Sequence, residues 1–320
     1  MSAPLILALP SKGRLKEQTE DWLRDCGLPL RAAGGERGYL GRVEGLDGVE
    51  VRYLSASEIA AGLFAGHVHL GVTGEDLLRE LAEDLEARVM LLQALGFGRA
   101  DLVVAAPKSW IDVETMSDVD EVAHLYLART GRRLRVATKY LAQTRAFFAR
   151  HGVADYRIVE STGATEGAPA AGSAELVCDI TTTGATLAAN GLKVLRDGLI
   201  LASQAQLAAS LAADWSGAGL ALVRSLARII EARARARETA ILSWPPDQDA
   251  AARRATAKFS DAAAGAQPFG FLTPTRRLFA VADALAAEAV GPVTVSHPAY
   301  VFEATSATVE ALALRLASKN

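Results

Sequence analysis

A turn rich in hydroxyl side chains lies between the apolar residues 176–178, which have the pattern of a strand end, and a helical pattern that follows. Hydroxyl and backbone N–H groups at the start of a helix converge on one point, where the helix dipole favours an anion. The turn therefore indicates a phosphate-binding loop, while a helix N-cap with additional threonines explains it about as well. Asp179 can accept hydrogen bonds from ribose hydroxyls or hold Mg²⁺ through water. The candidate loop residues are Asp179, Thr181, Thr182, Thr183, Gly184, Ala185, Thr186 and Leu187.

Two cations follow the apolar residues 5–9, at the point where a helical pattern begins. Lys12 and Arg14 flank Gly13, whose missing side chain lets the backbone pass close to a ligand. Positive charges are unfavourable at a helix N-terminus, so a bound anion would resolve the conflict. Taken alone, the segment is better explained by two solvated side chains. Lys139 follows another predicted strand and supplies a further cation, although a lysine in such a place usually faces solvent.

Two more segments place candidate binding residues at the ends of predicted strands. Gly74 and Asp76 lie in a turn that opens a helix with acidic residues in its first turn, and capping alone explains such residues in most proteins. The run Gly96, Phe97 and Gly98 has three interpretations: a hinge, a flat backbone surface against which a purine could lie, or an ordinary tight turn.

His67 and His69 lie on one face of a short strand, with a spacing that suits a pair of metal ligands. No cysteine or third histidine follows nearby, so a metal site is not expected there. The sequence also lacks the P-loop, nucleophile-elbow and zincin motifs, which argues against the commonest NTPase, hydrolase and zinc-protease functions.

Short apolar runs alternate with helical patterns, which predicts an α/β fold with a mainly parallel sheet covered on both faces. Residue 134 begins a second α/β lobe, and the chain then returns to the first lobe, leaving a ligand site between the two. From residue 238, Ala-rich helices broken by prolines indicate a third, small α/β unit. The predicted helices include residues 57–65, 119–128 and 220–237, and the predicted strands are residues 5–9, 49–54, 70–73, 89–95, 102–106, 134–138, 156–160, 176–180, 199–203, 239–243, 269–272 and 293–303.

The charge balance argues against nucleic acid as a partner. The 320 residues include 34 Lys and Arg against 37 Asp and Glu, a net charge of −3, so no overall positive field attracts a polyanion. The two cysteines fit a reducing compartment, and the sequence shows neither a signal peptide nor an apolar stretch of about 20 residues. We therefore expect a cytoplasmic protein with no membrane segment.

Taken in order, these segments resemble the ATP phosphoribosyltransferase family, whose enzymes begin histidine biosynthesis. The matching runs are LALPSKGRL (7–15), LGVTGEDLL (70–78), LGFG (95–98) with LVVA (102–105), RVATKY (135–140), and DITTTGATL (179–187) followed by ANGL (189–192). The resemblance implies a two-lobed fold like that of the periplasmic binding proteins. Lobe I would comprise residues 1–98 and 182–236, lobe II residues 99–181, and a C-terminal regulatory or assembly domain residues 237–320.

The resemblance also implies a reaction, in which N1 of ATP attacks C1 of phosphoribosyl pyrophosphate and pyrophosphate leaves, with Mg²⁺ as the cofactor. Lys12, Arg14 and Lys139 would be the catalytic cations, and Asp179 would hold the metal through water. By matching position, the ATP side would comprise Lys12, Gly13, Arg14, Gly74, Asp76, Gly96, Phe97 and Gly98. The phosphoribosyl pyrophosphate side would comprise Glu166, Asp179 and residues 181–187.

The sequence departs from the family at two places, since Ala100-Asp101 replaces the usual Cys-Arg and Ala164 replaces a serine. The family has a short form, which depends on a subunit resembling histidyl-tRNA synthetase, and a long form with a C-terminal domain that binds histidine. The length here is that of the long form, so the resemblance implies feedback by histidine and a homo-oligomer, a dimer or a hexamer. The alternative is a non-catalytic two-lobed protein that binds or senses a small molecule.

Overall fold

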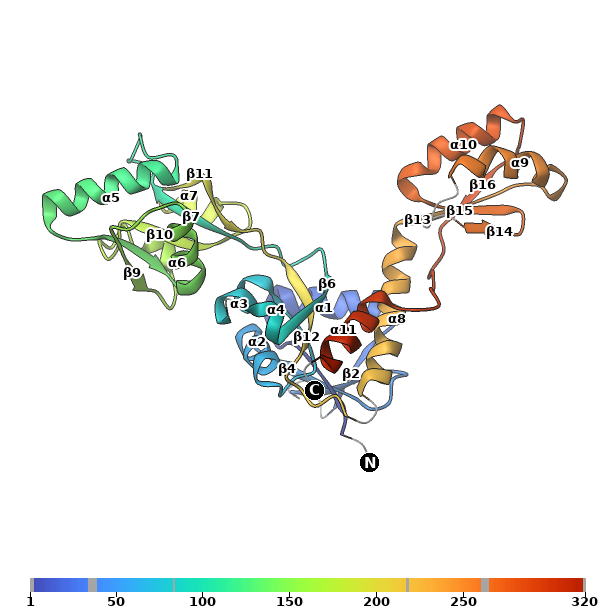
Figure 1. The fold of residues 1–320 in the computed structure, drawn as a ribbon, viewed down its shortest axis with the longest axis horizontal. Helices are drawn as coiled ribbons and strands as arrows, with labels where there is room; N and C mark the ends of the chain where they lie inside the picture. Colours follow the sequence, from blue (N-terminus) through green and yellow to red (C-terminus); the bar gives the residue numbers. More distant parts are fainter. Residues whose placement is uncertain (1–2, 34–38, 83, 217–218, 260–264, 319–320) are drawn as a thin grey trace. The chain divides into compact units, whose positions relative to one another are not determined.

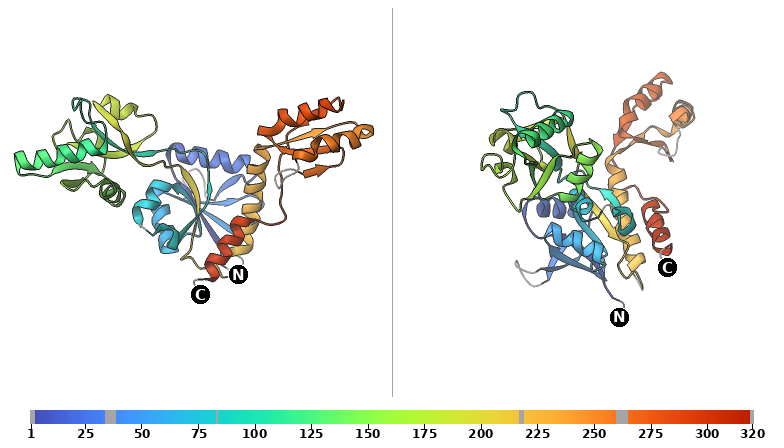
Figure 2. Two further views of the ribbon diagram at one scale, coloured as in Figure 1. Left: turned by 45° about the horizontal axis from the view of Figure 1, so that its top comes forward. Right: turned by 60° about the vertical axis from the view of Figure 1, so that its left-hand side comes forward.

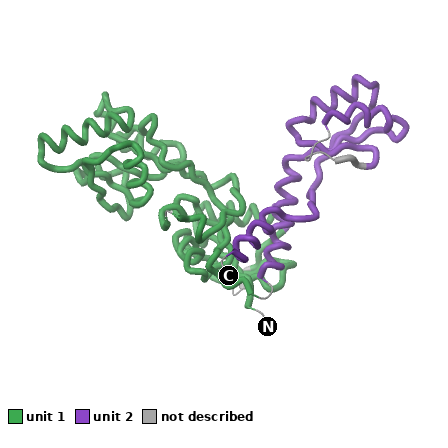
Figure 3. The backbone as a smooth tube through the Cα atoms, viewed as in Figure 1, with its two compact units in different colours: residues 1–24, 28–218 green, residues 25–27, 219–320 purple. Residues whose placement is uncertain are grey.

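The computed structural model describes residues 3–33, 39–82, 84–216, 219–259 and 265–318. These residues belong to two compact units, one formed by residues 1–24 and 28–218 and the other by residues 25–27 and 219–320 (Figure 3). Within these described ranges, no helix is both long enough and apolar enough to cross a membrane.

The first unit contains two sheets, and the first of them is centred on three parallel strands. β1 (Leu5–Pro10) pairs in parallel with β4 (Val49–Leu54) and β5 (Leu70–Gly74). The complete order is β2-β3-β4-β1-β5-β12-β6, with β2 (Leu30–Ala33), β3 (Leu40–Val43), β12 (Ala205–Ser210) and β6 (Val89–Ala94) in antiparallel pairs. Figure 1 labels β2, β4, β6 and β12 of this sheet. The connecting helices are α1 (Gly13–Asp25), α2 (Ala56–Ala65), α3 (Glu75–Leu81) and α4 (Leu85–Arg88).

The second sheet of this unit has the order β11-β7-β10-β8-β9. Its strands are β11 (Leu192–Leu201), β7 (Asp101–Pro107), β10 (Leu176–Thr181), β8 (Leu134–Thr138) and β9 (Tyr156–Glu160). Val104 and Leu176 belong to a core with α5 (Met116–Thr130) and α6 (Leu141–Arg150), whereas Val103 and Val177 belong to a core with α7 (Ala185–Ala189). Apolar residues are therefore buried on both faces of this sheet.

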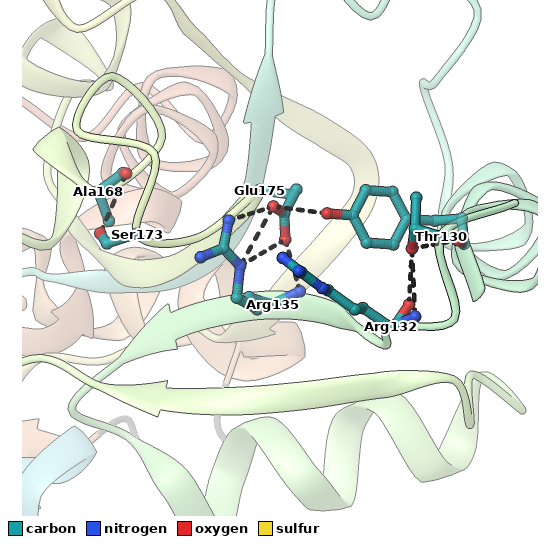
Figure 4. Close-up of polar contacts among 7 residues, drawn as sticks. Thr130, Arg132, Arg135, Ala168, Ser173 and Glu175 are labelled. Atoms are coloured by element: carbon teal, nitrogen blue, oxygen red, sulfur yellow. Dashed lines mark hydrogen bonds and ion pairs between the residues drawn. The ribbon is translucent and has the colours of Figure 1, made fainter.

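The beginnings of β8 and β10 are held together by one carboxylate. Glu175 accepts hydrogen bonds from the backbone N–H of Arg135 at 2.7 Å and from its Nη2 at 2.6 Å (Figure 4). Nε of Arg135 and the Tyr126 hydroxyl, each 3.2 Å from Glu175, add two further donors. In the turn before β10, the Ser173 hydroxyl donates to the carbonyl of Ala168. These contacts hold together the start of β8, which Lys139 follows, and the start of β10, which contains Asp179.

The chain crosses between the two sheets twice, through residues 95–100 and 202–204. The two crossings are hydrogen-bonded, because Ala100 N donates to Ser203 O and Ala205 N donates to Phe97 O, both at 3.0 Å. They form the connection between the two lobes of the first unit.

The α/β class is confirmed, but two features of the predicted arrangement differ. The sheets are mixed rather than mainly parallel, because β12 returns between β5 and β6 and because β7 runs antiparallel to both of its neighbours. Residues 192–201 form β11 of the second sheet, so the chain returns to the first sheet only after residue 201 and not at residue 182. The predicted strand 199–203 is the end of β11, and β2, β3, β12 and β14 (Gly265–Gln267) were not predicted.

The second unit contains a four-stranded antiparallel sheet in the order β14-β15-β13-β16. Along the chain the elements follow a strand-helix-strand-strand-helix-strand sequence, the ferredoxin-like topology. They are β13 (Thr239–Ser243), α9 (Asp249–Thr256), β14 (Gly265–Gln267), β15 (Gly270–Pro274), α10 (Leu278–Ala287) and β16 (Thr294–Ser296). Leu242, Trp244, Phe271, Val281 and Leu285 are buried together in its core.

The second unit also contains α8 (Gly219–Arg237), which the prediction had assigned to lobe I as residues 220–237. Residues after β16 return along this helix instead of continuing the predicted strand 293–303, since Val301 N donates to Ala232 O and Arg235 Nε donates to Val301 O. α11 (Ala307–Ala317) then packs beside α8, as both views in Figure 2 show. The second unit therefore begins before the predicted residue 237.

Candidate functional site

A cavity of about 490 Å³ in the first unit is lined by residues from both lobes. Parallel strands β1 and β5 end on the same edge of the first sheet, so the turns after them lie close together. Six predicted ATP-side residues line this cavity together: Arg14, Gly74, Asp76, Gly96, Phe97 and Gly98. Ile180 of β10 and Thr182, which follows that strand, line it as well. Of the predicted phosphoribosyl pyrophosphate residues, all of which the structure describes, Thr182 reaches this cavity, whereas Glu166, Asp179 and the rest of the turn are not among its lining residues.

The predicted cations lie at strand ends and face solvent. Gly13 begins α1 with φ +71°, a left-handed conformation that favours glycine, and Lys12 and Arg14 beside it are exposed. Arg14 lines the cavity, whereas Lys12 and Gly13 are not among its lining residues. Within the described part of the chain, neither Lys12 nor Arg14 makes an ion pair. Arg14 is therefore available to an anion, whereas the charge of Lys12 also acts on Glu58, whose pKa is lowered first by hydrogen bonds with Ser55 and then by Lys12.

Two glycines on the wall of the cavity are required by close contacts. A Cβ atom at Gly74 would lie 2.2 Å from Oδ1 of Asp76, so a larger residue would displace that carboxylate. Gly98 has φ +62°, and a Cβ there would lie 3.0 Å from Leu15 and 3.2 Å from Ala205. Both positions keep the backbone close to the ligand space.

The side chain of Asp76 is buried, and both of its oxygens are already hydrogen-bonded. Oδ2 accepts from the Tyr140 hydroxyl at 2.7 Å, and Oδ1 accepts from the Ser203 hydroxyl at 2.9 Å. Burial, followed by the charge and hydrogen bond of Asp76, raises the pKa of Tyr140, so the phenol stays a donor. Asp76 thus connects α3, the end of β8 and the crossing after β11, and its carboxylate is less available to a nucleotide than the sequence suggested.

The N-terminus of α6 in the second lobe is capped by a residue of the first lobe. Glu80 of α3 accepts hydrogen bonds from Ala142 N at 2.8 Å and from Gln143 N at 3.2 Å. The Gln143 side-chain amide donates to the carbonyl of Asp76 at 2.9 Å. Together with the Asp76–Tyr140 hydrogen bond, these contacts fix the two lobes against each other near the cavity.

Three predicted residues gather at the ends of β8 and β10. Thr138 pairs with Cys178, so Lys139 and Asp179 follow on neighbouring strands. Burial raises the pKa of the Asp179 carboxyl, a hydrogen bond from Ile180 N and the charge of Lys139 lower it, and the charge of Glu166 raises it again. The charges of one cation and one further carboxylate therefore act on Asp179, which suits a carboxylate that binds ribose hydroxyls or a metal through water.

Some side chains of the hydroxyl-rich turn accept hydrogen bonds from the backbone of the turn itself. The Thr181 hydroxyl accepts from Gly184 N at 2.8 Å, which is the capping role that was left open, and Thr183 accepts from Ala185 N at 3.4 Å. Thr186 is exposed and its side chain is open to a ligand. Leu187 is buried in the core of the second sheet, which leaves its backbone and not its side chain for the predicted contact.

Several residues near the cavity were not predicted from the sequence. No local sequence pattern marks Ser203 or Glu80 as a functional residue, because their hydrogen-bond partners lie far away in the chain. The sequence signal of Tyr140 is only that of an aromatic residue beside Lys139. Arg99 lines the cavity without having been singled out.

His69 has a structural role rather than a metal-binding one. Its Nδ1 accepts from Ile6 N at 3.1 Å, and its Nε2 donates to Asp214 O at 2.9 Å, so both ring nitrogens are used. In the described ranges no three His, Cys, Asp or Glu side chains form a group that could hold a metal.

Comparison with known proteins gives a consistent result. A family model described as ATP phosphoribosyltransferase matches residues 55–232. The ATP phosphoribosyltransferase of Caulobacter vibrioides is 64% identical over 319 residues, which cover 100% of both chains. That of Bradyrhizobium diazoefficiens is 54% identical over 310 residues, 95% of each chain. Among solved structures, the ATP phosphoribosyl transferase (HisG:HisZ) complex from Thermotoga maritima matches with a TM-score of 0.52 at 24% identity, over 71% of this chain and 96% of that one, a likeness of fold.

Proposed function

Because the chain belongs to the ATP phosphoribosyltransferase family of histidine biosynthesis, we propose that ATP and phosphoribosyl pyrophosphate react in the 490 Å³ cavity of the first unit. The enzyme joins N1 of ATP to C1 of phosphoribosyl pyrophosphate and releases pyrophosphate. The observation that carries the proposal is the convergence of Arg14, the Gly96–Gly98 turn and Thr182 on one space. We propose that ATP lies on the first-lobe side and the phosphoribosyl group on the side of Asp179.

Substitution at an anomeric carbon passes through a state with oxocarbenium character, while negative charge grows on the leaving pyrophosphate. The residues therefore need to hold two polyanions in line and to balance that charge, and no general base is required for the attack of N1. Arg14 and Lys139 are exposed cations from the first and second lobes. Asp179 accepts hydrogen bonds from the ribose hydroxyls, and Thr186 with the turn around it binds the 5-phosphate.

The carboxylates near the end of β10 suit a magnesium ion whose other ligands come mainly from the substrate. Mg²⁺ keeps several waters and takes one or two carboxylates together with substrate phosphates, so it does not need a protein cage. The carboxylate of Asp179, with that of Glu166 near enough to raise its pKa, supplies such ligands. We propose that Asp179 holds the ion through water and that the ion neutralises phosphate charge when it is bound.

The purified full-length chain should release pyrophosphate from ATP and phosphoribosyl pyrophosphate with Mg²⁺, and should stop when the metal is removed with EDTA. Pyrophosphate release in a coupled assay measures this, and adding back Mg²⁺ is the control. Binding of both substrates without turnover, even after a histidyl-tRNA-synthetase-like subunit is added, would favour the non-catalytic alternative. Turnover only with that subunit would assign the chain to the short form, which depends on a partner.

We further propose that the ferredoxin-like part of the second unit binds histidine as an effector, and that the enzyme is a cytoplasmic homo-oligomer, a dimer or a hexamer. The sheet β14-β15-β13-β16 has its own core, and all the residues assigned to chemistry lie outside it. Both cysteines are free and buried, which fits a reducing compartment.

Removing residues 239–296 should abolish inhibition by histidine and leave turnover intact. A truncation from residue 238 would also remove α11 and the residues bonded to α8, so the better variant joins residues 238 and 297 with a short Gly-Ser linker and keeps α11. Coupling between such sites is typically about 1–3 kcal/mol, or roughly 5- to 150-fold in affinity. Inhibition curves for both proteins provide the measurement, and equal inhibition of both would place the effector site elsewhere.

A further inference from the structure

Arg99 is a second cation on the wall of the cavity. Among the described residues that line this space, the basic ones are Arg14, from the start of α1, and Arg99, from the crossing between β6 and β7. Arg99 is exposed, and within the described part of the chain it makes no ion pair. The acidic lining residue is Asp76, whose two oxygens already accept from Tyr140 and Ser203. With two cations and one carboxylate, the described lining of the cavity carries a net positive charge.

The backbone around Arg99 is fixed on both sides of the residue. Before it, Gly96 N donates to the side chain of Gln204 at 3.0 Å, and Gly98 has a left-handed conformation. After it, Ala100 N donates to Ser203 O at 3.0 Å. At Arg99 itself, the Thr182 hydroxyl donates to the carbonyl oxygen at 3.2 Å, from the hydroxyl-rich turn of the other lobe. An exposed, flexible guanidinium thus extends from a backbone position that the second lobe helps to hold.

We propose that Arg99 binds the polyphosphate of a substrate in this cavity, and that Thr182 positions it through the hydrogen bond to its backbone. The inference rests on the proposed function and adds a residue to it. A guanidinium can donate two parallel hydrogen bonds to phosphate oxygens, which a lysine cannot do. The polyphosphate has two possible sources, the triphosphate of ATP and the pyrophosphate of phosphoribosyl pyrophosphate. Thr182 belongs to the second lobe. Through its hydrogen bond to Arg99, substrate binding in the second lobe helps to place the guanidinium of Arg99 for the substrate in the first lobe.

The test compares Arg99→Gln and Arg99→Lys with the wild type. Loss of a charge-assisted hydrogen bond pair should raise the KM of one substrate, or lower kcat, by roughly 10- to 100-fold. Arg99→Lys should recover part of the loss, because the charge returns without the planar fork. A rise in KM for ATP alone assigns the contact to the triphosphate, and a rise for phosphoribosyl pyrophosphate alone assigns it to the pyrophosphate. A fall in kcat at constant KM places the contact on the leaving pyrophosphate in the transition state.

Arg129→Gln is the matched control, since Arg129 is an exposed arginine near the end of α5 and does not line the cavity. It should keep wild-type kinetics, and all variants should keep the wild-type melting temperature. Unchanged kcat and KM for both substrates in Arg99→Gln would overturn the proposal. A wild-type chain that releases no pyrophosphate would instead contradict the proposed function, so the two failures are distinguishable.

The positioning role of Thr182 has its own pair of variants. Thr182→Val removes the hydroxyl and should shift the same kinetic constant as Arg99→Gln, by a smaller factor, whereas Thr182→Ser keeps the donor and should restore it. The double variant Thr182→Val with Arg99→Gln should be no worse than Arg99→Gln alone, because both act on one contact. Additive losses would show that Thr182 acts independently of Arg99 and would overturn the positioning role.

Discussion

Asp179→Asn should lower kcat/KM for phosphoribosyl pyrophosphate by roughly 10- to 150-fold, corresponding to about 1.5–3 kcal/mol for a lost charged hydrogen bond, and should leave the protein at least as stable. The carboxylate lies on β10, where the charges of Lys139 and Glu166 act on it, and its pKa is raised because burial penalises the charged form. An amide keeps the shape and removes that penalty. Activity and stability should therefore change in opposite directions.

The effect on stability should depend on pH. A raised pKa means that the folded protein binds the proton of Asp179 more tightly than the unfolded chain does. The stabilisation that this tighter proton binding gives the folded protein is complete at low pH. It is lost as the pH rises above the ordinary pKa of 3.8 and through the higher pKa of Asp179 in the folded protein. The melting temperature of Asp179→Asn relative to the wild type should accordingly rise over that range and then level off.

Thermal melts from pH 3 to 8 test the prediction for stability, and steady-state kinetics near neutral pH test the prediction for activity. Asp112→Asn is the control, because Asp112 is exposed. Wild-type kinetics in Asp179→Asn would remove this residue from the substrate site. If the melting temperature of Asp179→Asn relative to the wild type fell as the pH rises, burial would not be the main cause of the shift in the pKa.

Asp76→Ala should cause the largest loss of stability, about 2–5 kcal/mol in the free energy of unfolding of the first unit. The change leaves the buried hydroxyls of Tyr140 and Ser203 without their acceptor, and it breaks the contact between α3 and the segment after β8. Because Asp76 and Gly74 line the cavity together, turnover should fall as well. Urea denaturation followed by fluorescence measures the free energy.

Tyr140→Phe tests the same contact with a smaller change. It should cost about 1–3 kcal/mol, since one oxygen of Asp76 loses its donor. The double variant Asp76→Ala with Tyr140→Phe should cost less than the sum of the two single variants. Asp47→Ala, at an exposed turn between β3 and β4, is the control and should change stability by less than about 0.5 kcal/mol. If Asp76→Ala lowered the free energy of unfolding by less than about 0.5 kcal/mol, the hydrogen bond between Asp76 and Tyr140 would not stabilise the protein.

Many elements of this fold could be predicted from local patterns alone. The predicted strands at Val49–Leu54, Leu134–Thr138, Tyr156–Glu160 and Thr239–Ser243 match β4, β8, β9 and β13 at both ends. Apolar residues in such runs must be buried, and the turn residues that follow end the strand within the sequence itself. Candidate binding residues were found for the same reason, because turns after parallel strands gather at one edge of a sheet.

The antiparallel strands show the limit of this reasoning. β12 lies between β5 and β6, and its register depends on residues more than 100 positions away. The pattern of residues 205–210 shows that they are apolar enough to be buried, but it contains nothing that selects a direction or a neighbour. The strand was missed, and the lobe boundary predicted at residue 182 lies before the point, after residue 201, at which the chain returns to the first sheet.

The sequence by itself determined the family, the α/β class and the segments that form the cavity. Only the tertiary structure decided which of these residues are free to bind. Asp76 is occupied by partners 64 and 127 residues away, Thr181 caps its own turn, Leu187 is buried, and Arg99 is held by Thr182 on the edge of the ligand space. The physical reason is that a side chain's type and spacing specify what it can donate or accept, whereas its actual partner depends on which distant segments packing brings within hydrogen-bond distance.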